Sequence, residues 1–516
     1  MVENFIFQTI YYVNNDLSLF TFLISTTVIT SAVTIVLITD FSRKGLRTLT
    51  LNSTNLVHAQ LIVFLLTTYL TGLSWLMYNA GPIAVFSNGA VCKLDIGSLT
   101  ASCIILIAII AFLGSVVAKV HIGLEELILY LILGLVAPAL VATQNLLSFF
   151  VGLETISFSF FILTGLRGAT FSFAKGKRNA PNNRPAEAAL RYLIPALFSS
   201  LILLVGIGFI YINIPTLDLE EIKLTLYYQI LFNPTTNWGV RLGLILIVIS
   251  FLFKFTAVPF HRWVFGVYSG VPLYVVFLIS TIAKLIYFLG FVKIIWPICS
   301  LLSIHYLVAL VGFFSIFIGT IHGIYEYRFS VVLACSGVLN MGYALLALSL
   351  GTVVGTAIAI FSLIVYVSLV LGLGMLLHQP RFRIVALNTN VERIDNFTEW
   401  ANGGFSIIAG LTIVSFALIG VPPLIGFFPK FFLFTNLLIN FPAIVSWGFL
   451  VSVIISAFIY FQWILQLATS KLPYVSLTLT WAANNLGLIA GSSILVAGWE
   501  PLVDWSLVGS VLCGGG

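Results

Sequence analysis

The sequence predicts an all-α polytopic membrane protein, and three observations support this fold class. Of the 516 residues, 60% are hydrophobic and only 8% are charged, whereas an average soluble domain carries roughly 25% charged residues. The mean hydropathy is +1.13. The apolar residues form long continuous stretches without the alternation of a β-barrel, which leaves membrane-crossing helices. This composition excludes a soluble enzyme, a nucleic-acid-binding protein and a disordered chain.

A helix needs roughly 20 mostly apolar residues to cross a bilayer, and fourteen segments meet this requirement. The boundary between the third and the fourth segment is marked only by Lys119 and His121. In chain order the segments centre on residues 17–39, 59–80, 96–118, 122–140, 143–166, 190–213, 239–260, 271–294, 299–320, 329–350, 352–378, 403–428, 444–469 and 474–498.

The basic residues of the connecting loops support this count. Odd-numbered loops hold 15 lysines and arginines, whereas even-numbered loops hold four. Basic residues are enriched in loops on the cytoplasmic or matrix side of a membrane. We therefore expect the odd loops to face that side and both termini to face the other. The net charge of +6 is then explained by topology, without an anionic partner.

The cysteines and the first residues of the chain argue against a metal site and against a targeting segment. No two of the five cysteines form a CxxC pair, which disfavours an iron–sulfur, zinc or haem-attachment site. The first 18 residues contain Glu3 and Asp16 but no lysine or arginine, unlike a secretory signal or a transit peptide. The cysteines are Cys92, Cys103, Cys299, Cys335 and Cys513.

Four ionisable side chains lie within or beside the apolar spans: Glu154, Lys254, Lys284 and Lys430. A charge inside a membrane span is costly and by default marks an ion or substrate path. The alternative for each is a side chain that snorkels to the interface or binds a neighbouring helix. Long apolar flanks around Lys284 and Lys430 argue against snorkelling. Three lysines and one glutamate together favour the functional interpretation.

Two of these lysines stand beside predicted helix breaks. Lys254 precedes Pro259 and His261, and Lys430 follows a proline pair that ends at Pro423. Proline removes a backbone hydrogen bond, and carbonyls freed inside a membrane must line a cavity or meet polar groups. Interrupted helices at corresponding positions of two halves are typical of an inverted repeat around an ion site.

The spacing of the breaks predicts the domain organisation. Five helices separate them, and an odd repeat length inverts the second copy. We expect two inverted five-helix repeats, each with one broken helix. The predicted regions are about three N-terminal helices at 1–120, repeats at 121–295 and 296–470, and a C-terminal helix and tail at 471–516.

Buried lysines are suited to carrying protons, because burial and neighbouring charges change how tightly an ammonium group holds its proton. We expect Glu154 with Lys254, then Lys284, then Lys430, to form a series of such sites, with His261 as a further candidate in the first break. Water or hydroxyl groups must bridge these sites. The side chains placed to hold such water are Ser157, Ser250, Thr256, Ser280, Thr281, Ser336 and Asn340.

Six stretches between about residue 120 and residue 470 resemble a known family, the antiporter-like membrane subunits of respiratory complex I (NADH:ubiquinone oxidoreductase), in particular its subunit 2. Over the first ~120 residues the resemblance rests on hydropathy alone. In order, the stretches are VGLETISFSFFILTGLR, EAALRYLIPALFSS, FLFKFTAVPFHRWVFGVYSGVP, STIAKLIYF, LACSGVLNMGYALLALSLG and SFALIGVPPLIGFFPKFF.

The resemblance implies a proton-translocating subunit of NADH:ubiquinone reductase without redox chemistry of its own. It implies that Glu154 pairs with Lys254, that Lys284 is the central relay and that Lys430 is the terminal site near the exit. NADH, FMN, iron–sulfur clusters and ubiquinone would belong to other subunits, so no cofactor is expected in this chain. The implied partners are the other membrane subunits and the lipid bilayer, with no nucleic acid. We expect the mitochondrial inner membrane, or alternatively a bacterial plasma membrane.

Several positions depart from the family pattern. Gly266 and Ser269 replace acidic or amide residues of the family. Ser330 and Val331 replace basic residues, and Pro429 replaces a glycine. These departures concern the first break, the start of one helix and the residue directly before Lys430.

Two other functions compete with this interpretation. A subunit of a multisubunit cation/proton antiporter would share the architecture without redox coupling. Its first break typically reads LPxAHxEAP, whereas this chain has PFHRWVFGVYSGVP, and the lysine at position 430 disfavours subunit 4 of complex I, which typically has glutamate there. A purely structural membrane spacer is the third possibility, and the polar series inside the spans argues against it.

Overall fold

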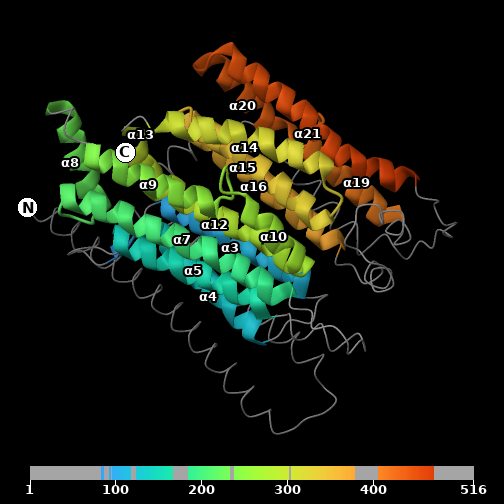
Figure 1. Cartoon of the computed structure of the whole chain (residues 1–516), viewed down its shortest axis with the longest axis horizontal. Coiled ribbons are helices and arrows are strands. Elements are labelled where there is room, and N and C mark those ends of the chain that lie inside the picture. Colours follow the sequence, from blue (N-terminus) through green and yellow to red (C-terminus); the bar gives the residue numbers. More distant parts are fainter. Residues whose placement is uncertain are drawn as a thin grey trace, which may run out of the picture. The chain divides into compact units, whose positions relative to one another are not determined.

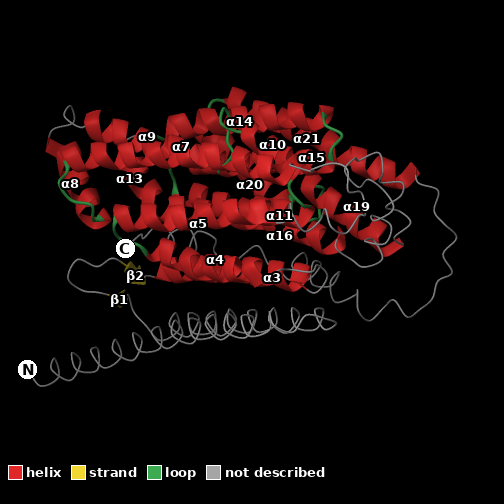
Figure 2. Cartoon of the chain, turned by 60° about the horizontal axis from the view of Figure 1, so that its bottom comes forward, coloured by secondary structure: helices red, strands yellow, loops and turns green. Residues whose placement is uncertain are grey.

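The structure, a computed structural model, describes residues 83–85, 92–94, 96–117, 124–166, 184–232, 238–301, 304–377 and 405–469. These residues are mainly helical, as predicted, and they include one short hairpin in which β1 (Ile83–Val85) pairs antiparallel with β2 (Cys92–Leu94) (Figure 2). The spans expected at 17–39, 59–80 and 474–498 lie outside the described residues.

The chain divides into two compact units, and the smaller comprises residues 1–163 and 211–236. Within it, α3 packs against α4, where the rings of Phe112 and Tyr130 lie 5.9 Å apart. The described helices that lie wholly or mostly in this unit are α3 (Ile96–Val117), α4 (Leu124–Ala142), α5 (Leu146–Leu166) and α8 (Leu219–Phe232) (Figure 1).

Hydrogen bonds join the beginning of α5 to the beginning of α8. The backbone N–H of Leu146 donates to the carbonyl of Leu217 at 3.0 Å, and that of Leu219 donates to Gln144 at 2.9 Å. Glu220 and Glu221 occupy the first turn of α8, where negative charge stabilises a helix. The hydropathy of the sequence does not predict α8, because its 14 residues are too few to cross a bilayer.

The larger unit comprises residues 164–210 and 237–515. Its helices α14, α15 and α16 follow one another in sequence and pack side by side (Figure 1). The helices outside the interrupted span described next are α7 (Arg184–Asn213), α9 (Trp238–Lys254), α10 (Arg262–Gly270), α14 (His305–Tyr325), α15 (Phe329–Leu348), α16 (Val353–Leu377), α19 (Phe405–Ile419), α20 (Phe427–Asn440) and α21 (Ala443–Thr469).

One span of this unit, Leu273–Leu301, contains two π-helical turns, and its most apolar stretch of 18 residues is wholly buried. Burial on all sides explains why it is apolar all round, because no face meets a polar environment. Its segments are α11 (Leu273–Leu278), η1 (Ile279–Ala283), α12 (Lys284–Gly290), η2 (Phe291–Ile295) and α13 (Trp296–Leu301).

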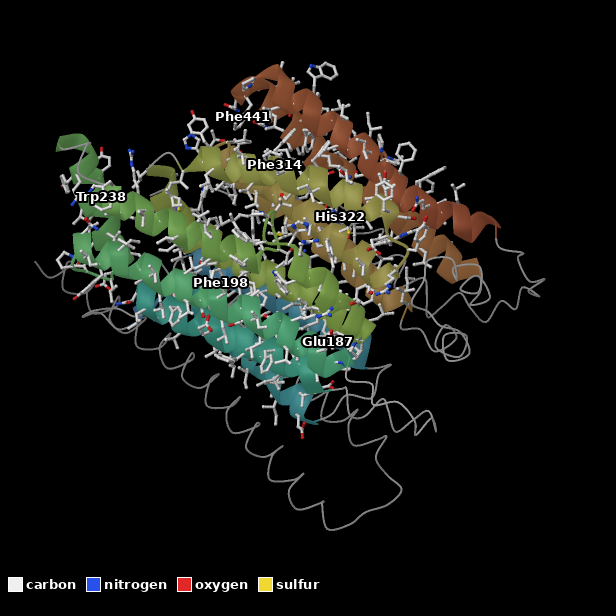
Figure 3. The ribbon with its side chains drawn as sticks, viewed as in Figure 1. Glu187, Phe198, Trp238, Phe314, His322 and Phe441 are labelled. Carbon is white, nitrogen blue, oxygen red and sulfur yellow. The ribbon has the colours of Figure 1, made fainter. Side chains whose placement is uncertain are left out.

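Seven helices of the described part are long and apolar enough to cross a membrane, and each overlaps a predicted span. Large apolar side chains such as Phe198 and Phe314 are exposed on helix surfaces (Figure 3), as expected for faces that meet lipid. The seven are Leu146–Leu166, Pro185–Asn213, Leu273–Leu301, His305–Tyr325, Phe329–Leu348, Val353–Gly374 and Val445–Leu465.

The structure corrects the ends of the two predicted spans that contain the breaks. The spans expected at 239–260 and 403–428 hold α9 and α19, but the chain re-enters a helix after each break, as α10 and α20. Arg262 begins α10, and Lys430 and Asn436 lie in α20. Such polar residues lower the local hydropathy. The spans predicted from hydropathy therefore leave out most of α10 and α20, the helices that follow the breaks.

Candidate functional site

Two backbone hydrogen bonds end helix α9 at the first break. The N–H of Ala257 donates to the carbonyl of Leu252 at 3.0 Å, and the N–H of Thr256 donates to Phe253 at 3.2 Å. This pair of bonds is a Schellman motif, which requires a left-handed residue after the helix. Thr256 adopts φ 60°, a strained conformation for a β-branched residue and a frequent feature of functional sites.

The second break has the same hydrogen-bond pattern. The N–H of Val421 donates to Phe416 at 3.2 Å, and the N–H of Gly420 donates to Ala417 at 3.1 Å. Gly420 holds the left-handed position with φ 88°. Gly420 in the second break corresponds to Thr256 in the first, and Val421 corresponds to Ala257. The two breaks are therefore equivalent in local structure and in spacing.

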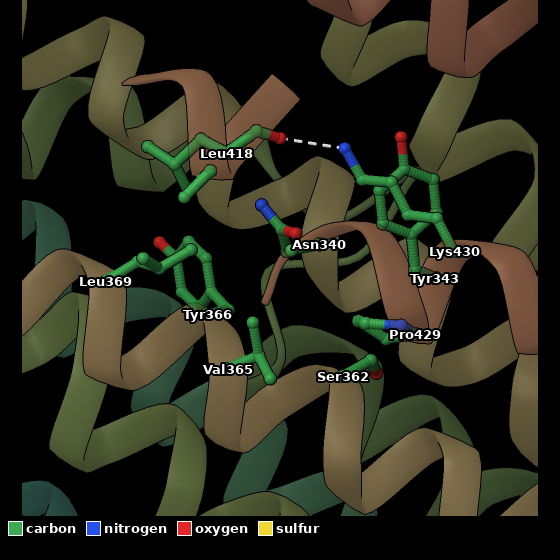
Figure 4. A pocket seen from close by; sticks show the side chains of 11 residues that line it. Asn340, Tyr343, Ser362, Val365, Tyr366, Leu369, Leu418, Pro429 and Lys430 are labelled. Carbon is green, nitrogen blue, oxygen red and sulfur yellow. Dashed lines mark hydrogen bonds between the residues drawn. The ribbon is translucent and has the colours of Figure 1, made fainter. Parts of the chain in front are cut away.

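Lys430 satisfies carbonyl groups that the second break releases. It lies in the first turn of α20, and its Nζ donates to the carbonyls of Leu418 at 2.7 Å and Ile419 at 2.8 Å (Figure 4). The last carbonyls of a helix have no partner within that helix, and a cation there is also favoured by the helix dipole. The lysine at this break thus has a structural role besides any role in transport.

Pro429 fits the beginning of α20. It is the third residue of this helix, where the backbone N–H would have no partner within the helix, so proline removes nothing that the helix needs. Pro429 is buried and lines the same cavity as Lys430. The replacement of the family's glycine therefore keeps both the helix and the position of the lysine.

Gly420→Ala is expected to destabilise the second break and displace Lys430. A left-handed conformation costs a residue with a side chain about 1–2 kcal/mol. The added Cβ would also lie 3.1 Å from Lys430 Cδ and 3.3 Å from its Nζ. Thermal unfolding of the assembled protein should show the loss.

Gly351→Ala is the matched control for this substitution, because Gly351 has φ 66° but no atom within 4 Å of an added Cβ. It carries the backbone strain without the contact to Lys430. Equal melting temperatures for the Gly420 and Gly351 variants would contradict the proposed displacement of the lysine.

Lys284 is buried in the middle of the larger unit. Its side chain is 2% exposed, and it directly follows the π-helical turn η1; π-helical turns often mark functional sites. Its Nζ lies 5.8 Å from the centre of the Tyr366 ring and has no hydrogen-bond partner among the described residues. An ammonium group without a hydrogen-bond partner in such a place costs stability.

Lys254 is the last residue of α9 and is 9% exposed. Its Nζ lies 5.1 Å from the centre of the Tyr287 ring. A similar arrangement holds Lys430, whose Nζ lies 5.6 Å from the Tyr343 ring. Each of the three lysines predicted from the sequence thus has a tyrosine ring at cation–π distance.

Sequence reasoning missed these tyrosines. Tyr287, Tyr343 and Tyr366 stand in apolar helical stretches, where an aromatic residue reads as part of the core. A weak signal was present in STIAKLIYF, where Tyr287 follows Lys284 by three positions. The signal misleads, because Tyr287 lies under Lys254 rather than under Lys284.

A small cavity adjoins Lys430. It offers about 20 Å³, enough for one water molecule. Polar groups from three helices line it: Asn340 on α15, Ser362 and Tyr366 on α16, and Lys430 on α20 (Figure 4). The structure thereby brings the surroundings of Lys284 and of Lys430 together, since Tyr366 belongs to both.

Most of the hydroxyl groups that we expected to hold water donate to their own helix instead. Ser157, Ser250, Ser280, Thr281 and Ser336 each donate to a backbone carbonyl three or four residues earlier. Of the seven side chains named for this role, Asn340 is the one that lines the cavity beside Lys430.

Glu154 and His261 are not among the residues that line this cavity. Glu154 is partly buried on α5 in the smaller unit, and Lys254 belongs to the larger unit, so their pairing stays a prediction. His261 is 7% exposed, and its ring centre lies 5.8 Å from that of His322 on α14 and 5.5 Å from that of Phe265. His322 was not predicted, because it is far from the first break in sequence.

Three of the five positions that depart from the family pattern lie around a second cavity of about 220 Å³. Gly266, Ser269 and Ser330 line it together with Arg191 and Arg328. Arg191, which forms an ion pair with the adjacent Glu187 of α7, lies over Gly266, and an added Cβ there would come 2.9 Å from its Nη1. A side chain at position 266 would therefore require the end of Arg191 to shift.

Comparisons with known proteins find membrane subunits of NADH:quinone oxidoreductase among the similar proteins. The family model described as "NADH:quinone oxidoreductase/Mrp antiporter, TM" matches residues 143–460. NADH-quinone oxidoreductase subunit N 1 of Acidiphilium cryptum is 29% identical over 60% of this chain and 60% of its own length. Subunit N of Ruthia magnifica is 30% identical over 65% of this chain and 66% of its own length. These relatives are named subunit N rather than subunit 2, and this chain spans less than two thirds of either.

A solved structure supports the fold. A chain of respiratory complex I from Thermus thermophilus, 20% identical, matches with a TM-score of 0.67 over 95% of this chain and all of that chain. At this identity the likeness concerns the fold alone. The family model, in contrast, covers more than half of the sequence, including both breaks and the lysines at positions 254, 284 and 430. The chain therefore belongs to the NADH:quinone oxidoreductase/Mrp antiporter transmembrane family.

Proposed function

We propose that this chain is an antiporter-like, proton-translocating membrane subunit of NADH:quinone oxidoreductase, of the type named subunit N in its relatives. The observation that carries this proposal is Lys284, a fully buried ammonium group without a hydrogen-bond partner in the described structure. No gain in stability explains a charge in that place. A group that takes up and releases a proton does explain it.

The proposed path runs through the predicted residues. Glu154 and Lys254 form its first site, Lys284 the central relay and Lys430 the terminal site, with His261 as an accessory group in the first break. The tyrosine ring beside each lysine supports this assignment. The face of the ring attracts the ammonium group but does not accept its proton in a hydrogen bond of fixed geometry. Protons move when quinone reduction elsewhere in the complex changes the charge and conformation around these sites.

We further propose fourteen membrane helices arranged around two inverted repeats, at 121–295 and 296–470. The equal spacing and equal hydrogen-bond pattern of the two breaks support the repeats. The proposed partners are other membrane subunits and the bilayer, and NADH, FMN, iron–sulfur clusters and ubiquinone bind to other chains. The relatives come from bacteria, which supports a bacterial plasma membrane beside the mitochondrial inner membrane expected from the sequence.

Lys254→Met tests the proposed function. In the assembled complex, reconstituted in vesicles, we expect fewer protons moved per NADH oxidised, because methionine fills the space of lysine without carrying a proton. Lys223→Met, in α8 outside the proposed path, is the control and should leave the ratio unchanged. A normal ratio in an assembled Lys254 variant would refute the role of this lysine.

A cation/proton antiporter subunit is the alternative, since the family description names both kinds of protein. The two differ in what binds to the chain. Purification of the intact complex from its membrane should yield flavin and iron–sulfur proteins and NADH:quinone activity under our proposal. An assembly that exchanges cations for protons without any redox protein would establish the alternative.

A further inference from the structure

Tyr366 of α16 contacts the surroundings of two lysines that lie on different helices. Its side chain is 1% exposed, and its ring centre is 5.8 Å from Nζ of Lys284. The same side chain lines the cavity of about 20 Å³ beside Lys430. Figure 4 shows its hydroxyl-bearing ring on the wall of this cavity, across from the lysine. One residue therefore spans the gap between the two sites.

Gly337 of α15 creates the space in which the first contact occurs. A Cβ at this position would collide with Nζ of Lys284 and would lie 3.0 Å from the hydroxyl oxygen of Tyr366. The ammonium group and the hydroxyl group thus converge on one point of α15. The absence of a side chain at Gly337 is what lets them meet there.

Polar groups continue from this point to Lys430. Ser336 and Tyr460 are the polar neighbours of the Tyr366 hydroxyl, and Ser336 and Asn340 are those of the Tyr460 hydroxyl. Asn340 and Ser362 lead into the cavity, whose volume accommodates one water molecule. Side chains with exchangeable hydrogens therefore lie between Lys284 and Lys430 in an otherwise apolar interior, although the hydroxyl groups of Tyr366 and Tyr460 form no direct hydrogen bond in the described structure.

We propose that the Tyr366 hydroxyl conducts protons between Lys284 and Lys430, and that Gly337 holds open the space where Lys284 meets it. The inference rests on the proposed function and names the residue that joins two of its sites. In the transfer, the hydroxyl oxygen accepts the proton that Lys284 releases, and the hydroxyl's own hydrogen passes toward the cavity and Lys430. The tyrosine ends neutral, and nothing is oxidised or reduced.

Tyr366→Phe tests the hydroxyl alone, because phenylalanine retains the ring, its packing and its face toward Lys284. In the assembled complex we expect proton transfer between the two sites to slow by about 100-fold, the lower end of what a positioned proton-transfer group contributes. The number of protons moved per NADH oxidised should then fall to the level of Lys284→Met. Tyr130→Phe, at an equally buried tyrosine of the smaller unit, should retain the normal ratio.

Gly337→Ala tests the space independently. The added methyl group must displace Lys284 or Tyr366, so we expect a loss of pumping similar to that of Tyr366→Phe although both functional side chains are present. Gly372→Ala is the matched control, because Gly372 lies on α16 with no atom within 4 Å of an added Cβ. Native gels and thermal unfolding show whether each complex assembles.

The outcomes separate this inference from the proposed function. Loss of pumping in Lys284→Met, Tyr366→Phe and Gly337→Ala, with normal controls, supports both. Loss in Lys284→Met together with a normal ratio in Tyr366→Phe overturns the inference and leaves the proposed function standing. A normal ratio in Lys284→Met overturns the proposed function and the inference with it. Should Gly337→Ala fail to assemble, Tyr366→Phe alone decides.

Discussion

Lys284→Met is expected to stop proton transfer through this chain without weakening the protein. Lys284 is almost completely buried and has no hydrogen-bond partner in the described structure. Burying such a group costs free energy that methionine, of similar length, does not incur. We therefore expect the variant to assemble and to melt at the same temperature or a higher one. Function and stability change in opposite directions, as they do at sites that are retained for activity.

The measurement combines two readouts on the assembled complex, the number of protons moved per NADH oxidised and the melting temperature. Lys293→Met is the control, because Lys293 lies in the same buried span, in η2, outside the proposed path. A clear fall in the melting temperature of Lys284→Met would assign the lysine a structural role. An unchanged proton ratio would remove it from the path.

Lys430→Met is expected to lose both pumping and stability. Nζ of Lys430 donates to the carbonyls of Leu418 and Ile419 at the end of α19, and methionine leaves both without this donor. A buried polar group without a partner costs about 1–3 kcal/mol. The same chemical change should therefore destabilise the protein at position 430 and not at position 284, because only one of the two lysines binds backbone carbonyls.

Lys430→Arg separates the two losses at this site. Arginine keeps the positive charge and the donors for the carbonyls, but it does not release its proton in proteins. We expect a melting temperature close to that of the unsubstituted protein together with reduced pumping. A melting temperature for Lys430→Met equal to that of the unsubstituted protein would contradict the capping role.

The sequence predicted a large part of this fold because a bilayer imposes simple rules. The seven spans found in the described part overlap predicted ones, since a membrane helix must be apolar over its whole length. Both breaks lie at the predicted prolines. Hydropathy failed where that rule does not apply. It missed α8, which is too short to span, and the polar second halves α10 and α20.

The sequence by itself determined which side chains are candidates for carrying protons, because a single ionisable side chain stands out in an apolar span. The tertiary structure alone decided what surrounds each charge. Tyr366, Asn340 and Gly337 come from two helices and meet Lys284 or Lys430 on others. In sequence Tyr366 and Gly337 read as ordinary members of buried helices, whereas Asn340 already stood out as a candidate for holding water. Their role depends on helix rotation and on sub-ångström packing, which hydropathy and periodicity do not encode.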